Sequence, residues 1–359
     1  MKAEKEIGSG RFVLLVFILL TVLSAVSTSC DKLPDEVCVE DIPAYYHVNG
    51  YLDSRVEAIY KAISECSGEY ESFFWITDIH WEPTLNTRFS PALIKYIASR
   101  TGISMILNGG DTGNSNVICE NAISQLRRAI GSDKVYTVTG NHEINDASRY
   151  EEPFQRVASE LRGHCEDIIY GNKDKSYFYF ENNAAKVRYI GLSSFGLFMN
   201  NDYATGYTDE QLEWFKNTAL NVDDDWTIII FTHSMFIAHT PDDKLLIAPA
   251  GADKFIDAID NYAGKGKIAC VLMGHSHKDR MHMGKTGVPY VISASDRHAT
   301  YHGDINVSRI PGTISEQHFE AVVWDKAARK INFFSIGANA RDGIDDDPGE
   351  EVNVRTVHY

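Results

Sequence analysis

The 359-residue sequence is poor in basic residues relative to acidic ones, with 34 lysines and arginines against 50 aspartates and glutamates. The formal net charge of −16 argues against binding nucleic acid through its phosphates, because such binding needs a basic surface. The six cysteines form no CxxC pair and no zinc-ribbon spacing, which excludes those cysteine-based metal sites. Cys270 lies within an apolar run, so we expect a buried free thiol there.

The N-terminal apolar run over residues 12–23 is shorter than the roughly 20 residues that a transmembrane helix needs. Basic residues precede the run and small residues follow it, which is typical of a secretory signal peptide; an uncleaved N-terminal anchor is the alternative. Cys30 follows Ser27-Thr28-Ser29, which resembles a bacterial lipoprotein signal whose cysteine is lipidated, although Ser27 stands where a leucine is usual. We therefore expect an exported protein, periplasmic or at the cell surface, with a lipid anchor at Cys30.

The sequence also lacks an internal repeat and a low-complexity linker that would divide it, which favours one large domain. We predict a lipoprotein-type signal peptide over 1–30, a tether over 31–53, the functional domain over 54–340 and an acidic tail over 341–359. Within the tail, the acidic run from Asp345 to Glu351 is expected to be disordered.

Short apolar runs of strand length alternate with amphipathic helical stretches in the first part of the domain, which is typical of βαβ units and a largely parallel sheet. The predicted strands lie within 73–80, 103–108, 134–139, 176–180, 186–192, 226–232, 267–273, 288–294, 318–324 and 331–336. The predicted helices are 54–66, 90–100, 119–130, 208–220 and 252–263, with a further helical and then irregular stretch over 151–172. The pattern past residue 288 indicates strands only.

Five of the predicted strands end in a polar cluster, and the clusters are Asp78/His80, Asp111, Asn141/His142, His233 and His275/His277. In α/β folds, ligands bind beyond the carboxyl ends of the strands, so we expect these side chains to converge. Glycine precedes three of the clusters, where it lets the backbone turn sharply near a crowded centre. Nitrogen and oxygen donors without cysteine suit manganese, iron or zinc.

The same five clusters, in this order, closely resemble the motifs of the calcineurin-like metallophosphoesterase family over residues 72–300. The resemblance implies a four-layer α/β/β/α sandwich of two mixed sheets, and it implies two metal ions. The first ion would be held by Asp78, His80, Asp111 and His277, and the second by Asp111, Asn141, His233 and His275. A carboxylate that bridges two ions, here Asp111, suits the spacing of about 3.5–4 Å that two-metal hydrolases use.

The resemblance also makes His142 the catalytic residue, either as the proton donor to the leaving alkoxide or as a contact to the phosphate. A hydroxide bridging the two metal ions would be the nucleophile, because the ions lower the pKa of a shared water. Glu143 either orients His142 or is a surface acid.

Further polar residues follow the last motifs. Asp279 and Arg280, and the later run Asp296-Arg297-His298, either place a cation near the phosphate or form surface salt bridges. Trp81 either stacks on a base or sugar of the substrate or packs in the core.

The expected function is metal-dependent hydrolysis of phosphate esters. Phosphodiesters are favoured because His80 is retained in the first motif, as in the family's cyclic-nucleotide and other phosphodiesterases. A phosphomonoesterase and a non-catalytic metal-binding scaffold on the same fold are the alternatives. The expected partner is a small phosphate ester, with no nucleic acid and with membrane contact only through the lipid anchor or signal segment.

Overall fold

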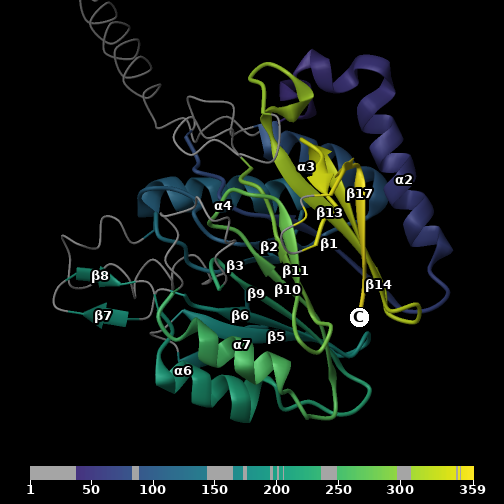
Figure 1. The fold of residues 1–359 in the computed structure, drawn as a ribbon. Coiled ribbons are helices and arrows are strands. Elements are labelled where there is room, and N and C mark those ends of the chain that lie inside the picture. The colour runs from purple at the N-terminus through teal and green to yellow at the C-terminus, as the bar shows by residue number, and fades with distance from the viewer. Residues whose placement is uncertain are drawn as a thin grey trace, which may run out of the picture. The chain divides into compact units, whose positions relative to one another are not determined.

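Two mixed β-sheets lie face to face in the described chain (Figure 1). The first sheet has the order β17-β14-β13-β1-β2-β3, formed by β1 Tyr70–Ile76, β2 Ile106–Asn108, β3 Val135–Thr137, β13 His318–Asp325, β14 Lys330–Gly337 and β17 Val354–His358. β1, β2 and β3 run parallel, whereas β13, β14 and β17 join in antiparallel register. Strands from the start and the end of the chain therefore share one sheet.

The second sheet has the order β11-β12-β10-β9-β6-β5-β4. It is formed by β4 Ile169–Asn172, β5 Tyr177–Asn182, β6 Val187–Leu192, β9 Thr227–Thr232, β10 Lys267–Met273, β11 Arg280–Met283 and β12 Pro289–Ile292. Its central strands β6, β9, β10 and β12 are parallel, so their carboxyl ends lie at one edge. Two short antiparallel ribbons complete the described strands, β7 Leu197–Met199 with β8 Asp202–Ala204 and β15 Ala340–Arg341 with β16 Glu351–Val352.

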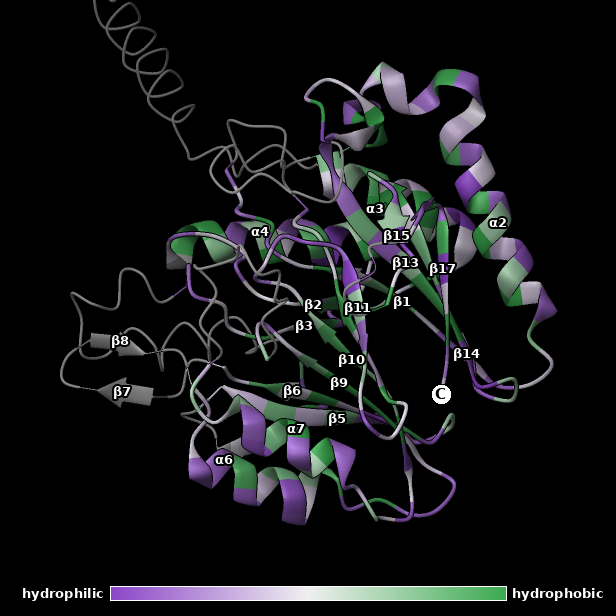
Figure 2. Ribbon diagram, viewed as in Figure 1, coloured by the Kyte–Doolittle hydropathy of each residue, from purple (hydrophilic) through white to green (hydrophobic). Residues whose placement is uncertain are grey.

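Helices cover the outer face of each sheet (Figure 1). The first sheet is covered by α2 Tyr51–Glu65, α3 Phe89–Thr101 and α4 Asn116–Ile130, and the second by α6 Asp209–Trp214, the π-helical turn η5 Phe215–Ala219 and α7 Ala252–Asp260. These helices carry apolar and polar stripes, as α6 and α7 show in Figure 2.

Alternation along the strands builds three apolar layers. In β1, Phe74 packs against the helices of the first sheet and Trp75 packs against the second sheet. In β9, Ile229 faces the first sheet, whereas Ile230 faces the helices of the second. The predicted four-layer α/β/β/α sandwich of two mixed sheets is thereby confirmed.

The computed structural model describes residues 38–82, 89–143, 165–172, 176–194, 197–199, 202–204, 206–235, 249–296, 309–344, 347 and 349–359. These residues belong to one compact unit, Val37–Tyr359. The predicted signal peptide, Cys30, most of the helical stretch predicted from residue 151, and Arg297 and His298 lie outside the described residues. Among the described helices, none has the length and apolar character to cross a membrane.

The predicted tether over 31–53 differs from the structure in its described part. The short 3₁₀ segments η1 Val39–Asp41 and η2 Ala44–Gly50 pack onto the first sheet and lead directly into α2. Tyr46 is fully buried, and its hydroxyl donates a hydrogen bond to Gln317 Oε1 at 2.5 Å. Aromatic anchoring of this kind holds the segment against the domain, although its prolines resemble those of a linker.

The predicted acidic tail over 341–359 also differs from the structure. Residues 354–358 form β17, which pairs with β14 in the register Lys330↔His358. Arg355 of this strand is buried among apolar and acidic side chains, so the strand is part of the domain. The sequence Val354-Arg355-Thr356-Val357 shows no apolar alternation, because the buried face of the strand carries an arginine beside a valine.

The remaining elements agree with the sequence analysis at most positions. The hairpin predicted from 176–180 and 186–192 is formed by β5 and β6, and residues 267–273 form β10 over the predicted range. β4 forms where an irregular segment was expected, and β11 was not predicted.

Candidate metal centre

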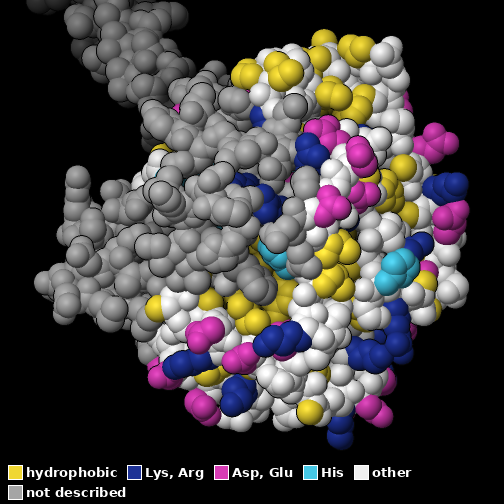
Figure 3. Space-filling model, in the orientation of Figure 1, with side chains coloured by type: hydrophobic (Ala, Val, Ile, Leu, Met, Phe, Trp, Pro, Cys, Tyr) yellow, Lys and Arg dark blue, Asp and Glu magenta, His cyan; other side chains and the backbone are white. Residues whose placement is uncertain are grey.

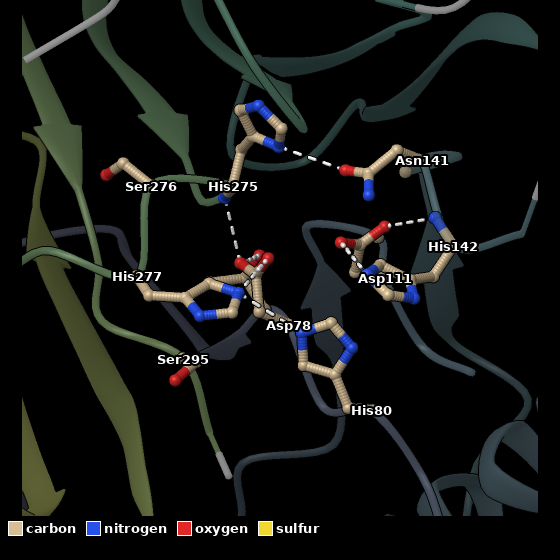
Figure 4. Close-up of polar contacts among 12 residues, drawn as sticks. Asp78, His80, Asp111, Asn141, His142, His275, Ser276, His277 and Ser295 are labelled. Atoms are coloured by element: carbon tan, nitrogen blue, oxygen red, sulfur yellow. Dashed lines mark hydrogen bonds and ion pairs between the residues drawn. The ribbon is translucent and has the colours of Figure 1, made fainter. Parts of the chain in front are cut away.

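The predicted clusters meet at the carboxyl ends of β1, β2, β3, β9 and β10 (Figure 4). Backbone hydrogen bonds join the loops that follow these strands. The Asp78 amide donates to Gly110 O at 2.9 Å, and the Gly274 amide donates to His233 O at 3.1 Å. The loops therefore form one connected platform, from which the side chains point toward a common centre.

The backbone of this platform is unusual at the ligand positions. Five of the seven predicted ligands have positive φ angles, with 52° at Asp78, 45° at His80, 52° at Asp111, 67° at His275 and 55° at His277. Residues with a Cβ seldom adopt this region, and such strain concentrates at functional sites. Asp78/His80 and His275/His277 are pairs at positions i and i+2, which share one face of an extended strand, and the left-handed turns set the direction in which each pair points.

Glycine has the expected role at two positions. A Cβ at Gly140 would clash with Asp111 Oδ1, and a Cβ at Gly274 would clash with Asp78 Oδ2. Both loops thus approach the two carboxylates as closely as bare backbone allows.

The side chains form two clusters that share Asp111. The donor atoms of Asp78, His80, Asp111 and His277 lie within 4.8 Å of one another, as do those of Asp111, His233 and His275. In the first cluster, His277 Nε2 lies 3.1 Å from His80 Nε2 and 3.2 Å from Asp78 Oδ1. These are the four residues that the resemblance assigns to the first ion.

The second cluster also includes Asn141. Its Oδ1 lies 3.1 Å from His233 Nε2 and 3.0 Å from His275 Nδ1, and the two ring nitrogens are 3.1 Å apart. His233 Nε2 lies 3.4 Å from Asp111 Oδ2. All seven predicted ligand positions therefore come together in the grouping expected from the sequence.

The clusters fit metal ions on two counts. Two ligands of one ion, each about 2.0–2.1 Å from it, lie about 2.9–3.4 Å apart at tetrahedral or octahedral angles, which matches the separations above. In addition, Asp78 Oδ1 is buried, and although His277 Nε2 lies 3.2 Å away, it accepts no well-directed hydrogen bond from a described residue. A buried carboxylate oxygen without a donor is costly unless a cation neutralises it.

The ionisation of the clusters follows from burial and mutual charge. Burial lowers the pKa of His80 and of His275 to about 4, which leaves both imidazoles neutral, the form that binds metal. Burial opposes the ionisation of Asp111, but the facing His233 holds the pKa of that carboxyl below its usual range. Burial likewise opposes the charge on His233, but the carboxylates of Asp111 and Asp78 raise its pKa to about 10. The centre therefore favours a positive charge between the carboxylates.

His142 lies at the rim of the clusters. Its backbone amide donates to Asp111 Oδ1 at 2.7 Å, and its ring Nε2 lies 3.9 Å from Asp111 Oδ2. The side chain is 32% exposed, whereas that of Asp111 is 2% exposed. His142 thus borders the centre without joining either cluster of donor atoms, on a side that solvent reaches.

Asn114 was not predicted as a site residue, and its Oδ1 lies 2.6 Å from His142 Nδ1. Its signal in the sequence was its position three residues after Asp111.

Glu143 has neither of the two roles expected for it. It is buried, and its carboxylate accepts backbone hydrogen bonds from Asp111, Thr112 and Gly140 at 3.0, 2.5 and 2.7 Å. Burial and the nearby Asp111 carboxylate raise the pKa of Glu143 to about 7. Glu143 therefore joins the loop after β2 to the loop after β3, and it supports Asp111 through the backbone.

The other candidates are also buried. Asp279 pairs with Arg355 at 2.8 Å in the interior, so the expected surface salt bridge is wrong for it. Asp296 accepts a hydrogen bond from Ser90 Oγ at 2.6 Å and is fully buried. Trp81 is buried with Nε1 donating to Asn121 Oδ1 at 2.9 Å, which favours core packing over substrate stacking. Cys270 is a buried free thiol, as predicted.

Acidic and basic side chains are interspersed on the described part of the face drawn in Figure 3. The expected lack of a nucleic-acid partner stays a prediction.

Comparison with known proteins identifies the family. The model of the calcineurin-like phosphoesterase family matches residues 72–279, which contain all five motifs. No curated protein matches the sequence. Similar solved structures include a dimetal phosphatase from Danio rerio, at 14% identity and a TM-score of 0.53, with 80% of this chain and 98% of that chain covered. A purple acid phosphatase from yellow lupin (Lupinus luteus) matches at 13% identity and a TM-score of 0.50, over 81% of this chain and 54% of that one. The chain belongs to the calcineurin-like phosphoesterase family and is a metal-dependent phosphoesterase.

Proposed function

We propose that this protein hydrolyses phosphodiesters at a dinuclear metal centre held by the two clusters that share Asp111. The observation that carries the proposal is that the Asp111 carboxylate belongs to both clusters, so one residue can contact two ions. Divalent cations bound there supply Lewis acidity to a phosphoryl oxygen and lower the pKa of a water. The donor set of imidazole, amide and carboxylate, without sulfur, suits manganese, iron or zinc.

The protein's own residues provide the proton for the leaving group. An amide oxygen can only accept, so the contact with Asn114 Oδ1 places a hydrogen on His142 Nδ1. The other ring nitrogen, Nε2, faces the two clusters and lies 3.9 Å from Asp111 Oδ2. It is therefore the nitrogen that can donate a proton to the leaving group. Its partial exposure leaves room for a substrate beside it, which supports the role of general acid.

The preference for diesters is supported by His80. This histidine belongs to the first cluster, and its ring centroid lies 4.6 Å from that of His142. The first motif of this chain, with a histidine at this position, resembles the first motif of the family's phosphodiesterases. The five motifs supply the candidate metal ligands but do not distinguish between leaving groups. A phosphomonoesterase is therefore the second candidate.

Substrate assays on reloaded protein test the proposal. Protein stripped with a chelator and reloaded with Mn²⁺, Fe²⁺ or Zn²⁺ is expected to hydrolyse bis-p-nitrophenyl phosphate faster than p-nitrophenyl phosphate. The opposite preference would identify a monoesterase. Metal binding with no turnover of either ester would contradict the proposal and indicate a non-catalytic scaffold.

The N-terminal sequence supports export to the periplasm or cell surface with a lipid on Cys30. Mass spectrometry of the native protein tests this, and a mature chain that begins at a lipidated Cys30 is expected. A chain that retains Met1, or that is cleaved beyond residue 30, would contradict it.

A further inference from the structure

A second cluster of titratable side chains lies in the interior and begins two residues after the candidate ligand His277. Donor atoms of Asp279, His318 and Glu320 lie within 4.8 Å of one another, and all three side chains are buried. The group has the composition of a third metal site, but the positively charged side chain of Arg355 already contacts both of its carboxylates. Arg355 Nη1 lies 2.8 Å from Asp279 Oδ1, and Arg355 Nη2 lies 2.7 Å from Glu320 Oε1.

Arg355 is the kind of residue that such a position requires. It comes from β17, its side chain is fully buried, and its planar guanidinium contacts both carboxylates at once. Two buried carboxylates would face each other with no positive charge between them if it were absent. The guanidinium of Arg355 therefore joins Asp279 to Glu320.

Asp279 connects this cluster to the loop that carries two ligands. It follows His277 by two residues and His275 by four, in a loop where both histidines have positive φ angles. A strained loop keeps its conformation only when its surroundings determine it fully. Asp279 anchors the C-terminal end of this loop through Arg355.

Glu320 connects the cluster to the loop that carries Asp78. Its Oε2 accepts a hydrogen bond from Ser293 Oγ at 2.8 Å, and Ser293 Oγ accepts one from Trp75 Nε1 at 2.9 Å. Trp75 precedes Asp78 by three residues at the end of β1. The Ser293 amide also donates to Met273 O, directly before Gly274.

We propose that Arg355 is a positioning residue of the metal centre. Through Asp279 it fixes the loop of His275 and His277, and through Glu320 it supports the strand end that presents Asp78. This inference rests on the proposed metal centre and deepens it, because it places a determinant of metal affinity on the last described strand, outside the five motifs. Groups that orient metal ligands from behind typically change metal affinity by about 10–100-fold when removed.

The test compares Mn²⁺ binding by two buried-arginine variants. Protein stripped of metal is titrated calorimetrically with Mn²⁺, at a temperature at which circular dichroism shows each variant to be folded. Arg355→Met is expected to raise the dissociation constant about 10–100-fold. The matched control is Arg188→Met, because Arg188 is also buried and pairs with Glu181 at 2.6 Å. Arg188 lies near the start of β6, at the opposite end of the strands from the metal centre.

The control separates positioning from general stability. Both variants are expected to lower the melting temperature of the metal-free protein, but only Arg355→Met is expected to weaken Mn²⁺ binding. Arg355→Lys keeps the charge without the two-sided contact, so its dissociation constant is expected to lie between those of the wild type and Arg355→Met. Equal weakening in Arg188→Met, or wild-type affinity in folded Arg355→Met, would overturn the proposal.

A second variant covers the case in which Arg355→Met does not fold. The triple substitution Asp279→Asn, Glu320→Gln and Arg355→Met removes all three buried charges at nearly constant volume, which proteins often tolerate. It is expected to fold and to bind Mn²⁺ about 10-fold or more weakly, and wild-type affinity in it would also overturn the proposal. If the wild-type protein itself bound no Mn²⁺, the metal centre and this inference would fail together, which distinguishes that outcome from a failure of Arg355 alone.

Discussion

Asn114 Oδ1 lies 2.6 Å from His142 Nδ1, so a residue of the loop after β2 holds the ring of a residue that follows β3. The contact sets which ring nitrogen faces the metal centre. We expect Asn114→Ala to lower kcat by up to about 100-fold, since small displacements of a catalytic group have effects of this size. Steady-state kinetics and metal analysis check this, because the metal content should not change.

The conservative variant Asn114→Asp keeps an oxygen acceptor in place. It is expected to restore most of the activity that Asn114→Ala loses and to shift the pH profile upward, because a carboxylate stabilises the imidazolium. If both variants were equally impaired, the contact would not orient His142.

The loss of hydrolysis rate in His142→Ala should depend on the leaving group of the ester. Removal of a general acid typically lowers the rate about 10²–10⁴-fold, and the loss is expected to be large for alkyl phosphate esters. For p-nitrophenyl esters the loss should shrink, because this leaving group hardly needs a proton. Equal losses on both esters would assign His142 to phosphate binding instead, and loss of bound metal would make it a ligand.

Asp111→Asn should lower the occupancy of both metal sites together, because its carboxylate belongs to both clusters. Metal analysis of protein purified without chelator is expected to give close to two equivalents for the wild type and a loss at both sites in the variant. Asp325→Asn is the matched control, since Asp325 is also buried. In the β1–β13 register it lies opposite Tyr70, at the end of β1 away from the metal centre. Full metal content in Asp111→Asn would refute the assignment of Asp111 to both metal sites.

Asp296 should make the stability of the protein depend on pH. Burial raises the pKa of Asp296 to about 7, although the Ser90 hydroxyl and the Arg309 guanidinium oppose the shift. Its usual pKa is about 3.9, so the folded state binds a proton between about pH 4 and pH 7 that the unfolded state has released. The contribution of Asp296 to stability is therefore present at low pH and is lost as the pH rises through this window.

Chemical denaturation across pH 4–8 checks this expectation. The difference in unfolding free energy between the wild type and Asp296→Asn should fall from about pH 4 to about pH 7 and then level off. A difference that stayed constant with pH would show that Asp296 titrates normally in the folded protein.

The metal centre was predictable because its signals are local. Each candidate ligand lies within a few residues of a buried strand, as Asp78 and His80 do after β1. A short stretch of sequence therefore contains both the apolar strand and the polar residues that follow it. Strand ends of parallel units share one edge, which makes their convergence a consequence of the topology. The order of the motifs then indicated the family and the two-sheet sandwich.

The supports of that centre were not predictable, because they join residues that are distant in sequence or make contacts that their neighbours in sequence do not reveal. Glu143 looked like an acid beside His142, and only the folded loops bring the amides of Asp111 and Thr112 to its carboxylate. Arg355 stood in a segment that composition marked as an acidic tail.

The candidate ligands could therefore be predicted from the sequence alone, since an apolar strand ending in a metal-binding residue is a pattern within a few neighbouring positions. The buried charges that hold these residues in place are apparent only in the folded chain. Arg355 lies 76 positions after Asp279 in the chain and 2.8 Å from it in space. No local pattern reports such a pair, because its charges are stable in the interior only when the β17 strand docks and brings them together.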